Sequence, residues 1–129
     1  ILLNGFFVAM FTLPSLLLFA LRNRMMRMNP ELMNFVEWLL RRNVHFTVTS
    51  AFRTKEQNDA CGGSKTSQHL TGDAVDLKPV DLSVDDFILL FESSSFTFDQ
   101  LIKYRTFVHI SFARGRKPRQ MKLDFTDRK

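Results

Sequence analysis

The sequence predicts an α+β domain in which a small antiparallel sheet is flanked by helices, with an additional hydrophobic helix at the N-terminus. Two patterns support this fold class: apolar residues recur at helical spacing in some segments and alternate with polar residues in others. The chain has 129 residues, of which 45% are hydrophobic. This is enough for one compact domain with an appendage, and it excludes global disorder.

The first segment, residues 1–21, contains no charged side chain, and arginines follow it directly. A helix of this length would extend roughly 31 Å, enough to cross the core of a bilayer. The arginines would then hold the following domain on the cytoplasmic side of the membrane. Three interpretations of residues 1–24 are open. They are a membrane anchor or uncleaved signal, a non-native extension before a start at Met25 or Met28, and a buried core helix.

A globular domain is expected over residues 25–113, beginning with a helix. Asn29 can cap this helix, and Pro30 suits its first position. The helix is expected to end near Arg41, with one apolar face directed inward. That face consists of Leu32, Phe35, Val36, Leu39 and Leu40.

Alternating residues predict a half-buried strand over residues 44–50, and a short strand is expected at 74–78. Two more strands are expected at 98–104 and 107–112, separated by a tight connection at Arg105–Thr106. Between the second and third strands, Ser83 is a suitable cap for a helix from Val84 to about Glu92. The polar segment 53–67 is expected to form a loop with a short helical turn.

The formal net charge is +5, and basic residues are concentrated in residues 114–129. We expect this segment to be a solvated basic tail. Such a tail favours anionic partners, namely wall polymers, lipid headgroups or nucleic acid, of which nucleic acid is the least favoured. Cys61 is the only cysteine. An intrachain disulfide and a cysteine-rich zinc site are therefore excluded.

Two histidines and one aspartate form the most informative set of polar residues. His69 precedes a glycine-containing turn, and Asp76 lies on the outward face of the strand that follows. His109 lies on the polar face of another strand. Two imidazoles and one carboxylate are a suitable set of ligands for catalytic zinc, with a fourth position left for water. Water bound in this way has a pKa near 7 and can act as a nucleophile.

Four motifs occur in the order of one known family. They are Ser50–Asn58, the Gly62–Gly63 pair, Ser67–Asp76 and Val108–Ser111. This set resembles the zinc D-alanyl-D-alanine carboxypeptidases and phage endolysin peptidases of the hedgehog/DD-peptidase fold. The resemblance extends over roughly residues 29–112 and joins several separate motifs.

The resemblance implies a role for each matching residue. Zinc is the implied cofactor, with His69, Asp76 and His109 as its ligands. Arg53 matches a substrate-binding arginine, whose guanidinium can hold a carboxylate or a carbonyl oxygen. The alternative for Arg53 is a salt bridge that holds the loop. The implied substrate site also includes Gln57 and Ser67, which would support it through hydrogen bonds.

The sequence departs from the family at the general base, which takes a proton from water. The family usually has Glu or Asp three residues before the last histidine, where this chain has Thr106. Related members place a Glu at the end of the preceding strand, but residues 103–105 are Lys, Tyr and Arg. Asp99 is the nearest candidate base in the sequence, and Glu92 is a second.

The resemblance therefore predicts a zinc metallopeptidase that hydrolyses D-amino-acid peptide bonds in the stem peptides or cross-links of peptidoglycan. The small size and the motif set suggest a phage-encoded enzyme that serves entry or lysis and is directed at the cell wall or periplasm. The alternative is a zinc-binding module with little or no activity and a structural or wall-binding role, associated with a virion or a membrane. The missing carboxylate favours this alternative, whereas the ligand set and Arg53 favour the enzyme.

Overall fold

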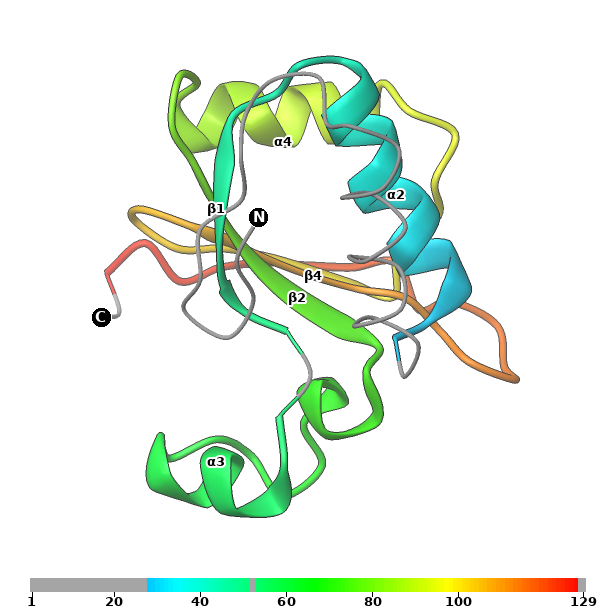
Figure 1. The fold of residues 1–129 in the computed structure, drawn as a ribbon, viewed down its shortest axis with the longest axis vertical. Coiled ribbons are helices and arrows are strands. Elements are labelled where there is room, and N and C mark those ends of the chain that lie inside the picture. Colours follow the sequence, from blue (N-terminus) through cyan, green and yellow to red (C-terminus); the bar gives the residue numbers. More distant parts are fainter. Residues whose placement is uncertain (1–27, 52, 128–129) are drawn as a thin grey trace, which may run out of the picture.

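A five-stranded sheet in the order β1-β2-β4-β3-β5 forms the centre of the computed structural model, which describes residues 28–51 and 53–127 (Figure 1). The α+β fold class is confirmed. The hydrophobic segment predicted at residues 1–24 lies outside the described residues. In the part that is described, no helix is both long and apolar enough to span a membrane.

Helix α2 (Pro30–Arg41) confirms the first predicted helix at both ends. The side chain of Asn29 accepts a hydrogen bond from the backbone N–H of Glu31, and Pro30 is the first helical residue. Asn29 also connects the start of the helix to the residues just before β2, because its backbone N–H donates to Gly72 O and its side-chain amide donates to Asp73. All five predicted apolar-face residues are buried.

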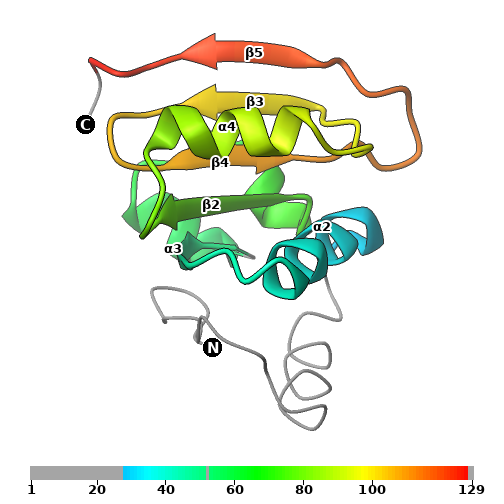
Figure 2. The ribbon, with the colours of Figure 1, turned by 90° about the horizontal axis from the view of Figure 1, so that it is seen from above.

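Helix α4 (Val84–Glu92) also has its predicted bounds, and the Ser83 side chain caps it by accepting from Asp86 N–H. Figure 2 shows α4 lying across β3 and β4, with α2 beside it near β2. The two helices meet the sheet in a core rich in phenylalanine, where the rings of Phe35 and Phe91 are 4.9 Å apart in an edge-to-face arrangement. Burial of each such ring stabilises the fold by roughly 2–3 kcal/mol.

Four strands pair antiparallel with one another in the order β1-β2-β4-β3: β1 (Phe46–Ser50), β2 (Ala74–Pro79), β4 (Val108–Ser111) and β3 (Gln100–Lys103). Strand β1 begins two residues later than predicted, because the N–H of Val44 bonds to Leu39 O and closes helix α2. In β2 and β4, alternate apolar side chains belong to the core under the helices. The residues between them, Asp76 and His109, consequently face the opposite side of the sheet.

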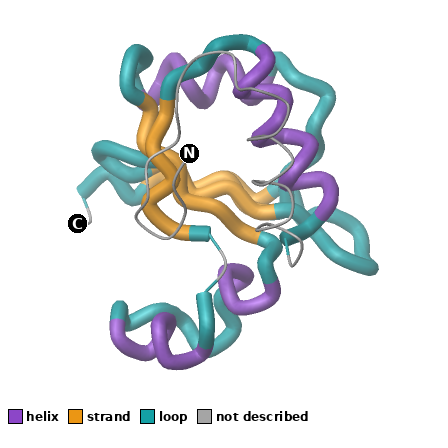
Figure 3. Tube along the Cα trace, in the orientation of Figure 1, coloured by secondary structure: helices purple, strands orange, loops and turns teal. Residues whose placement is uncertain are grey.

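The segment between β1 and β2 crosses to that opposite side. It contains α3 (Lys55–Ala60) and the short 3-10 helix η1 (Gln68–Thr71), which Figures 1 and 3 place apart from α2 and α4. The predicted loop with one helical turn therefore contains a capped six-residue helix. The helix layer thus stabilises one face of the sheet and leaves the other face to this segment.

The last strand corrects two expectations. Residues 114–129 were predicted to form a solvated tail, but they include β5 (Met121–Asp124), which pairs with β3. The pairing is parallel, so the prediction of a purely antiparallel sheet was wrong for this edge. The physical reason is the connection after β4. It passes around the start of β3, with left-handed backbone at Gly115 and Gln120, and then runs in the same direction as β3.

Asp99 holds this connection in place. Its carboxylate is fully buried and accepts paired hydrogen bonds from Arg116 at 2.8 Å, and from the side chain and backbone N–H of Arg119. Its own backbone carbonyl accepts from Met121 N–H at the start of β5. The hydrogen bonds from Arg116, and then those from Arg119, outweigh the effect of burial and hold the pKa of Asp99 well below its usual range.

We predict that Asp99→Asn destabilises the fold by about 3 kcal/mol near neutral pH, because both guanidinium groups lose their buried counterion. The pKa of Asp99 is lower in the folded than in the unfolded state. Its contribution is therefore complete above about pH 4 and decreases as the pH falls below that value. Urea unfolding at a series of pH values should show the two proteins converging in acid. The exposed Asp127→Asn is the control, and equal stability of Asp99→Asn and wild type at pH 7 would refute the prediction.

Candidate metal centre and its cleft

The two histidines and the aspartate singled out in the sequence lie together on the open face of the sheet. Asp76 and His109 are direct partners across the β2–β4 pair. The Oδ1 atom of Asp76 is 2.9 Å from Nδ1 of His109 and 3.2 Å from Nε2 of His69. The two imidazole rings meet edge to face, with centroids 5.1 Å apart. One ligand atom from each residue lies within 4.8 Å of the other two, so the three can hold a metal ion.

His69 reaches this cluster from η1, and its position is fixed at three points. The side chain of Ser67 caps η1 by accepting from the N–H of His69. Gly72 ends η1 in a left-handed conformation, with φ of 77°, which suits a residue without a Cβ atom. On the ring, Nδ1 is 2.7 Å from the carbonyl oxygen of Ala51. His69 is therefore buried with only Nε2 directed at Asp76.

The bond to Ala51 determines where the proton of His69 resides. A carbonyl oxygen can only accept, so Nδ1 must be the donor. In the neutral ring, Nε2 then carries a lone pair that faces the carboxylate oxygen of Asp76. Two acceptors 3.2 Å apart need a cation between them or a second proton on the ring. Ligand atoms around tetrahedral zinc at 2.0–2.1 Å are themselves about 3.3 Å apart, so the 3.2 Å between these two atoms allows both to bind one zinc ion.

The charge of Asp76 is retained in spite of its burial. Burial alone would raise the pKa of Asp76, but the side-chain contacts with His109 and His69 outweigh it and hold the pKa well below its usual range. Asp76 is thus a carboxylate under ordinary conditions. An anionic oxygen beside two imidazole nitrogens is the form in which these residues bind a divalent metal.

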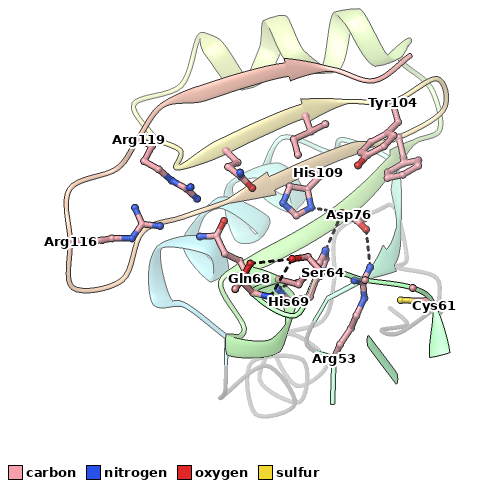
Figure 4. A pocket seen from close by; sticks show the side chains of 17 residues that line it. Arg53, Cys61, Ser64, Gln68, His69, Asp76, Tyr104, His109, Arg116 and Arg119 are labelled. Atoms are coloured by element: carbon pink, nitrogen blue, oxygen red, sulfur yellow. Dashed lines mark hydrogen bonds and ion pairs between the residues drawn. The ribbon is translucent and has the colours of Figure 1, made fainter. Parts of the chain in front are cut away.

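Arg53 lies beside the cluster, with its side chain only 19% exposed. Its Nη2 atom is 3.5 Å from Oδ2 of Asp76, and Nε donates to the Ser50 hydroxyl at 2.8 Å. Figure 4 shows the Arg53 side chain pointing at Asp76. The salt-bridge interpretation of Arg53 and the substrate-binding interpretation are therefore compatible, because the same group holds the loop and faces the cleft.

A buried asparagine that the sequence did not single out supports Arg53. Asn58 accepts from Nη1 of Arg53 at 3.3 Å and donates to the carbonyl oxygen of Ser64 at 2.8 Å. Gly63 packs against it so closely that a Cβ atom at this position would lie 2.1 Å from Oδ1 of Asn58. The glycine pair noted in the sequence thus provides the space that Asn58 needs to orient Arg53.

A cleft of about 910 Å³ opens over the cluster. Figure 4 shows Arg116 and Arg119 at one end and Tyr104 at the other, with His109 and Asp76 between them. The rings of Tyr104 and Phe107 stack with centroids 4.3 Å apart, and both residues line the cleft. Among the described residues that line it, Asp76 is the only carboxylate.

The remaining predicted site residues take different positions. Ser67 lines the cleft and orients His69. Gln57 does not line the cleft, because it forms a reciprocal capping box with Thr54 at the start of α3. The carboxylate of Asp99 is occupied by two arginines and by Nε2 of Gln68 at 3.0 Å. A carboxylate with its oxygens paired in this way and a lowered pKa is poorly suited to accept a proton from water.

The sequence missed Arg116 and Arg119 as cleft residues, because they lie in the segment expected to be a solvated tail. The only local signal was the density of basic residues after residue 113, which does not distinguish a tail from a folded segment. Glu92, the second candidate base, is also engaged elsewhere, since it pairs with Lys122 at 2.7 Å. Neither candidate carboxylate is directed at the cluster.

We predict that the folded protein binds one zinc ion through the cluster, and that His69→Ala, Asp76→Ala and His109→Ala each remove stoichiometric binding. Zinc should raise the melting temperature of wild type, because it binds the folded state preferentially. Metal analysis after gel filtration and thermal melting measure these effects. The matched control is His45→Ala, since His45 pairs with Asp81 outside the cluster. Retention of one zinc ion by all three cluster variants would exclude this site.

Comparison with known proteins agrees with a zinc site at this cluster. A search of curated proteins found no match. The family model described as Peptidase M15 matches residues 19–111, which include His69, Asp76 and His109. Peptidases of this family depend on zinc, and the cluster provides nitrogen and oxygen ligands suited to it. Because the match covers well over half of the chain, this protein belongs to the Peptidase M15 family.

Proposed function

We propose that the protein is a zinc-dependent peptidase that hydrolyses D-amino-acid peptide bonds of bacterial peptidoglycan, acting as a D,D-carboxypeptidase or as an endopeptidase of the endolysin type. A phage-encoded role in entry or lysis is the context that we propose for it. Membership of the M15 family supports a metallopeptidase, and the substrate is the further step of the proposal.

The observation that carries the proposal is the position of Arg53 beside the His69–Asp76–His109 cluster in an open cleft. A peptidase needs a metal centre and a cation that binds the peptide next to it. In this cleft Asp76 connects the two, because it contacts His69 and His109 on one oxygen and Arg53 on the other.

Each residue has a distinct task in this function. When bound, zinc supplies Lewis-acid activation of water and of the peptide carbonyl. Ala51 fixes the His69 ring by accepting from Nδ1, so that Nε2 remains available as a ligand. Arg53 binds the carboxylate or the carbonyl oxygen of the peptide and holds the bond near the cluster. The stacked Tyr104 and Phe107 rings provide an apolar wall at the opposite end from Arg116 and Arg119.

One observation favours a second function, that of a zinc-binding module with a structural or wall-binding role. Water needs a proton acceptor when it attacks a peptide, and a positioned base contributes about 10²- to 10⁴-fold to the rate. Among the described lining residues, Asp76 is the only carboxylate, and it already faces both imidazoles. The chain would then bind zinc and peptide but hydrolyse slowly.

Zymography on peptidoglycan separates the two functions. We predict a cleared zone for wild type and for His45→Ala, and none for His69→Ala, because loss of one ligand removes the metal on which hydrolysis depends. Added chelator should abolish clearing, and zinc should restore it. Equal clearing by wild type and His69→Ala would reject zinc catalysis. Absence of clearing by a zinc-loaded wild type would favour the binding module.

A gain of activity tests the missing base directly. Tyr104 directly follows β3 and lines the cleft. Its backbone N–H donates to Phe107 O in the turn that leads into β4. We predict that Tyr104→Glu raises kcat by about 10²-fold, since it introduces a carboxylate into the cleft. Tyr104→Phe retains an aromatic ring without the carboxylate and should not increase kcat. If both variants hydrolyse at the wild-type rate, a missing carboxylate does not limit this protein.

A further inference from the structure

The end of the cleft formed by Arg116 and Arg119 contains more positive charge than its structural role requires. Arg116 alone occupies both oxygens of Asp99, with Nη1 and Nη2 each 2.8 Å from the carboxylate. Arg119 then adds a second guanidinium to the same carboxylate, at 2.7 Å from Nη2 to Oδ2. Two cations on one anion leave a net charge of about +1 and repel each other. A single arginine would be enough to anchor Asp99.

Exposure to solvent differs sharply between Asp99 and the two arginines that bind it, which we call the Arg116–Arg119 pair. Asp99 is completely buried, whereas each arginine side chain is 45% exposed. Both arginines line the cleft, while Asp99 does not. The carboxylate therefore neutralises the inner side of the guanidinium groups and leaves their outer side facing the cleft. In the part of the chain that is described, Nη1 of Arg119 has no hydrogen-bond partner.

The pair is connected to the metal cluster through one residue. Gln68 donates from Nε2 to Oδ2 of Asp99, and it directly precedes His69 in η1. Its amide orientation is fixed, because a carboxylate can only accept the bond. Figure 4 places Arg53 and the Arg116–Arg119 pair on opposite sides of His69 and His109. An extended ligand lying across the cluster would meet Arg53 on one side and the pair on the other.

We propose that the Arg116–Arg119 pair is an anion subsite that binds a second carboxylate of the peptide, separate from the group bound by Arg53. A guanidinium fork matches a carboxylate in shape and charge, and Asp99 holds both forks in place before the ligand arrives. The preferred substrate is accordingly an acidic peptide. On one side of the bond to be cut its carboxylate meets the Arg116–Arg119 pair, and on the other side a carboxylate or a carbonyl oxygen meets Arg53. This inference rests on the proposed function, whose metal chemistry lies elsewhere in the cleft.

Two matched peptides test the subsite. Both are stem peptides ending in D-alanyl-D-alanine, and they differ only at the D-glutamyl residue, whose α-carboxylate is free in one and amidated in the other. Titration calorimetry of the full, zinc-loaded chain measures both affinities. Wild type should bind the free carboxylate about tenfold more tightly, as expected for a charge-assisted contact at a half-exposed site. Arg116→Gln and Arg119→Gln should each remove most of this preference without weakening binding of the amidated peptide.

The matched control is Arg114→Gln. Arg114 lies in the same connection and pairs with the buried Asp73 at 2.8 Å, but it does not line the cleft. This variant should retain the preference. Each single variant of the pair leaves one arginine on Asp99, so folding is preserved, and thermal melting verifies it. If one of these two variants does not fold, the binding measurements on the other test the subsite.

The outcomes separate the subsite from the proposed function. Equal affinity of wild type for the two peptides, or a preference that persists in the folded pair variants, overturns the subsite. Hydrolysis of both peptides without any preference retains the peptidase and rejects the subsite. A preference that is lost in Arg119→Gln, without hydrolysis of either peptide, supports the subsite and rejects the peptidase. Failure of wild type to bind either peptide rejects both.

Discussion

A buried carboxylate facing two imidazole nitrogens is the constraint around which the site is built. Asp76 would be costly to bury alone, and it is not alone: its Oδ1 atom faces His69 and His109, and its Oδ2 atom faces Arg53. The bond from His69 to Ala51 makes the arrangement more demanding, since it turns a lone pair toward Asp76. A divalent cation between the two atoms, or a second proton on the ring, resolves this conflict. The geometry is therefore more than a group of polar residues that happen to be close together.

One face of the sheet forms the hydrophobic core, and the other face carries the metal-binding cluster. Helices α2 and α4 cover one face with phenylalanine-rich packing, so the strands beneath them rest on a close-packed core. The alternate side chains of β2 and β4 then extend from a rigid support on the other face. The less regular elements, η1 and the segment around α3, complete the site from the loop side. This division explains how a chain of 129 residues can hold a defined cluster with few elements.

Local patterns predicted those parts of the fold that depend on neighbouring residues. The cap at Asn29, the bounds of α2 and α4, and the alternation in β2 and β4 follow from side-chain chemistry within a few positions. The convergence of His69 with Asp76 and His109 was expected from strand alternation together with the family resemblance, and their binding of zinc stays a prediction. The parallel pairing of β5 could not be read locally, because it depends on contacts between Asp99 and arginines 17 and 20 residues away. For the same reason, Arg116 and Arg119 were taken for part of a tail, and Asp99 for a candidate base.

The position of Asp99 also determines how the domain can be shortened. Its carboxylate touches Gln68 on the side of the cluster and the arginines of the final connection on the other side. A chain cut after β4 would retain all three residues of the cluster but would remove both arginines that neutralise the Asp99 carboxylate. The segment after β4, which the sequence suggested to be a tail, is thus part of the folded domain. Deletion or fusion at this end therefore has to begin beyond β5. A tag placed between Arg114 and Met121 would interrupt the segment that carries Arg116 and Arg119 to Asp99.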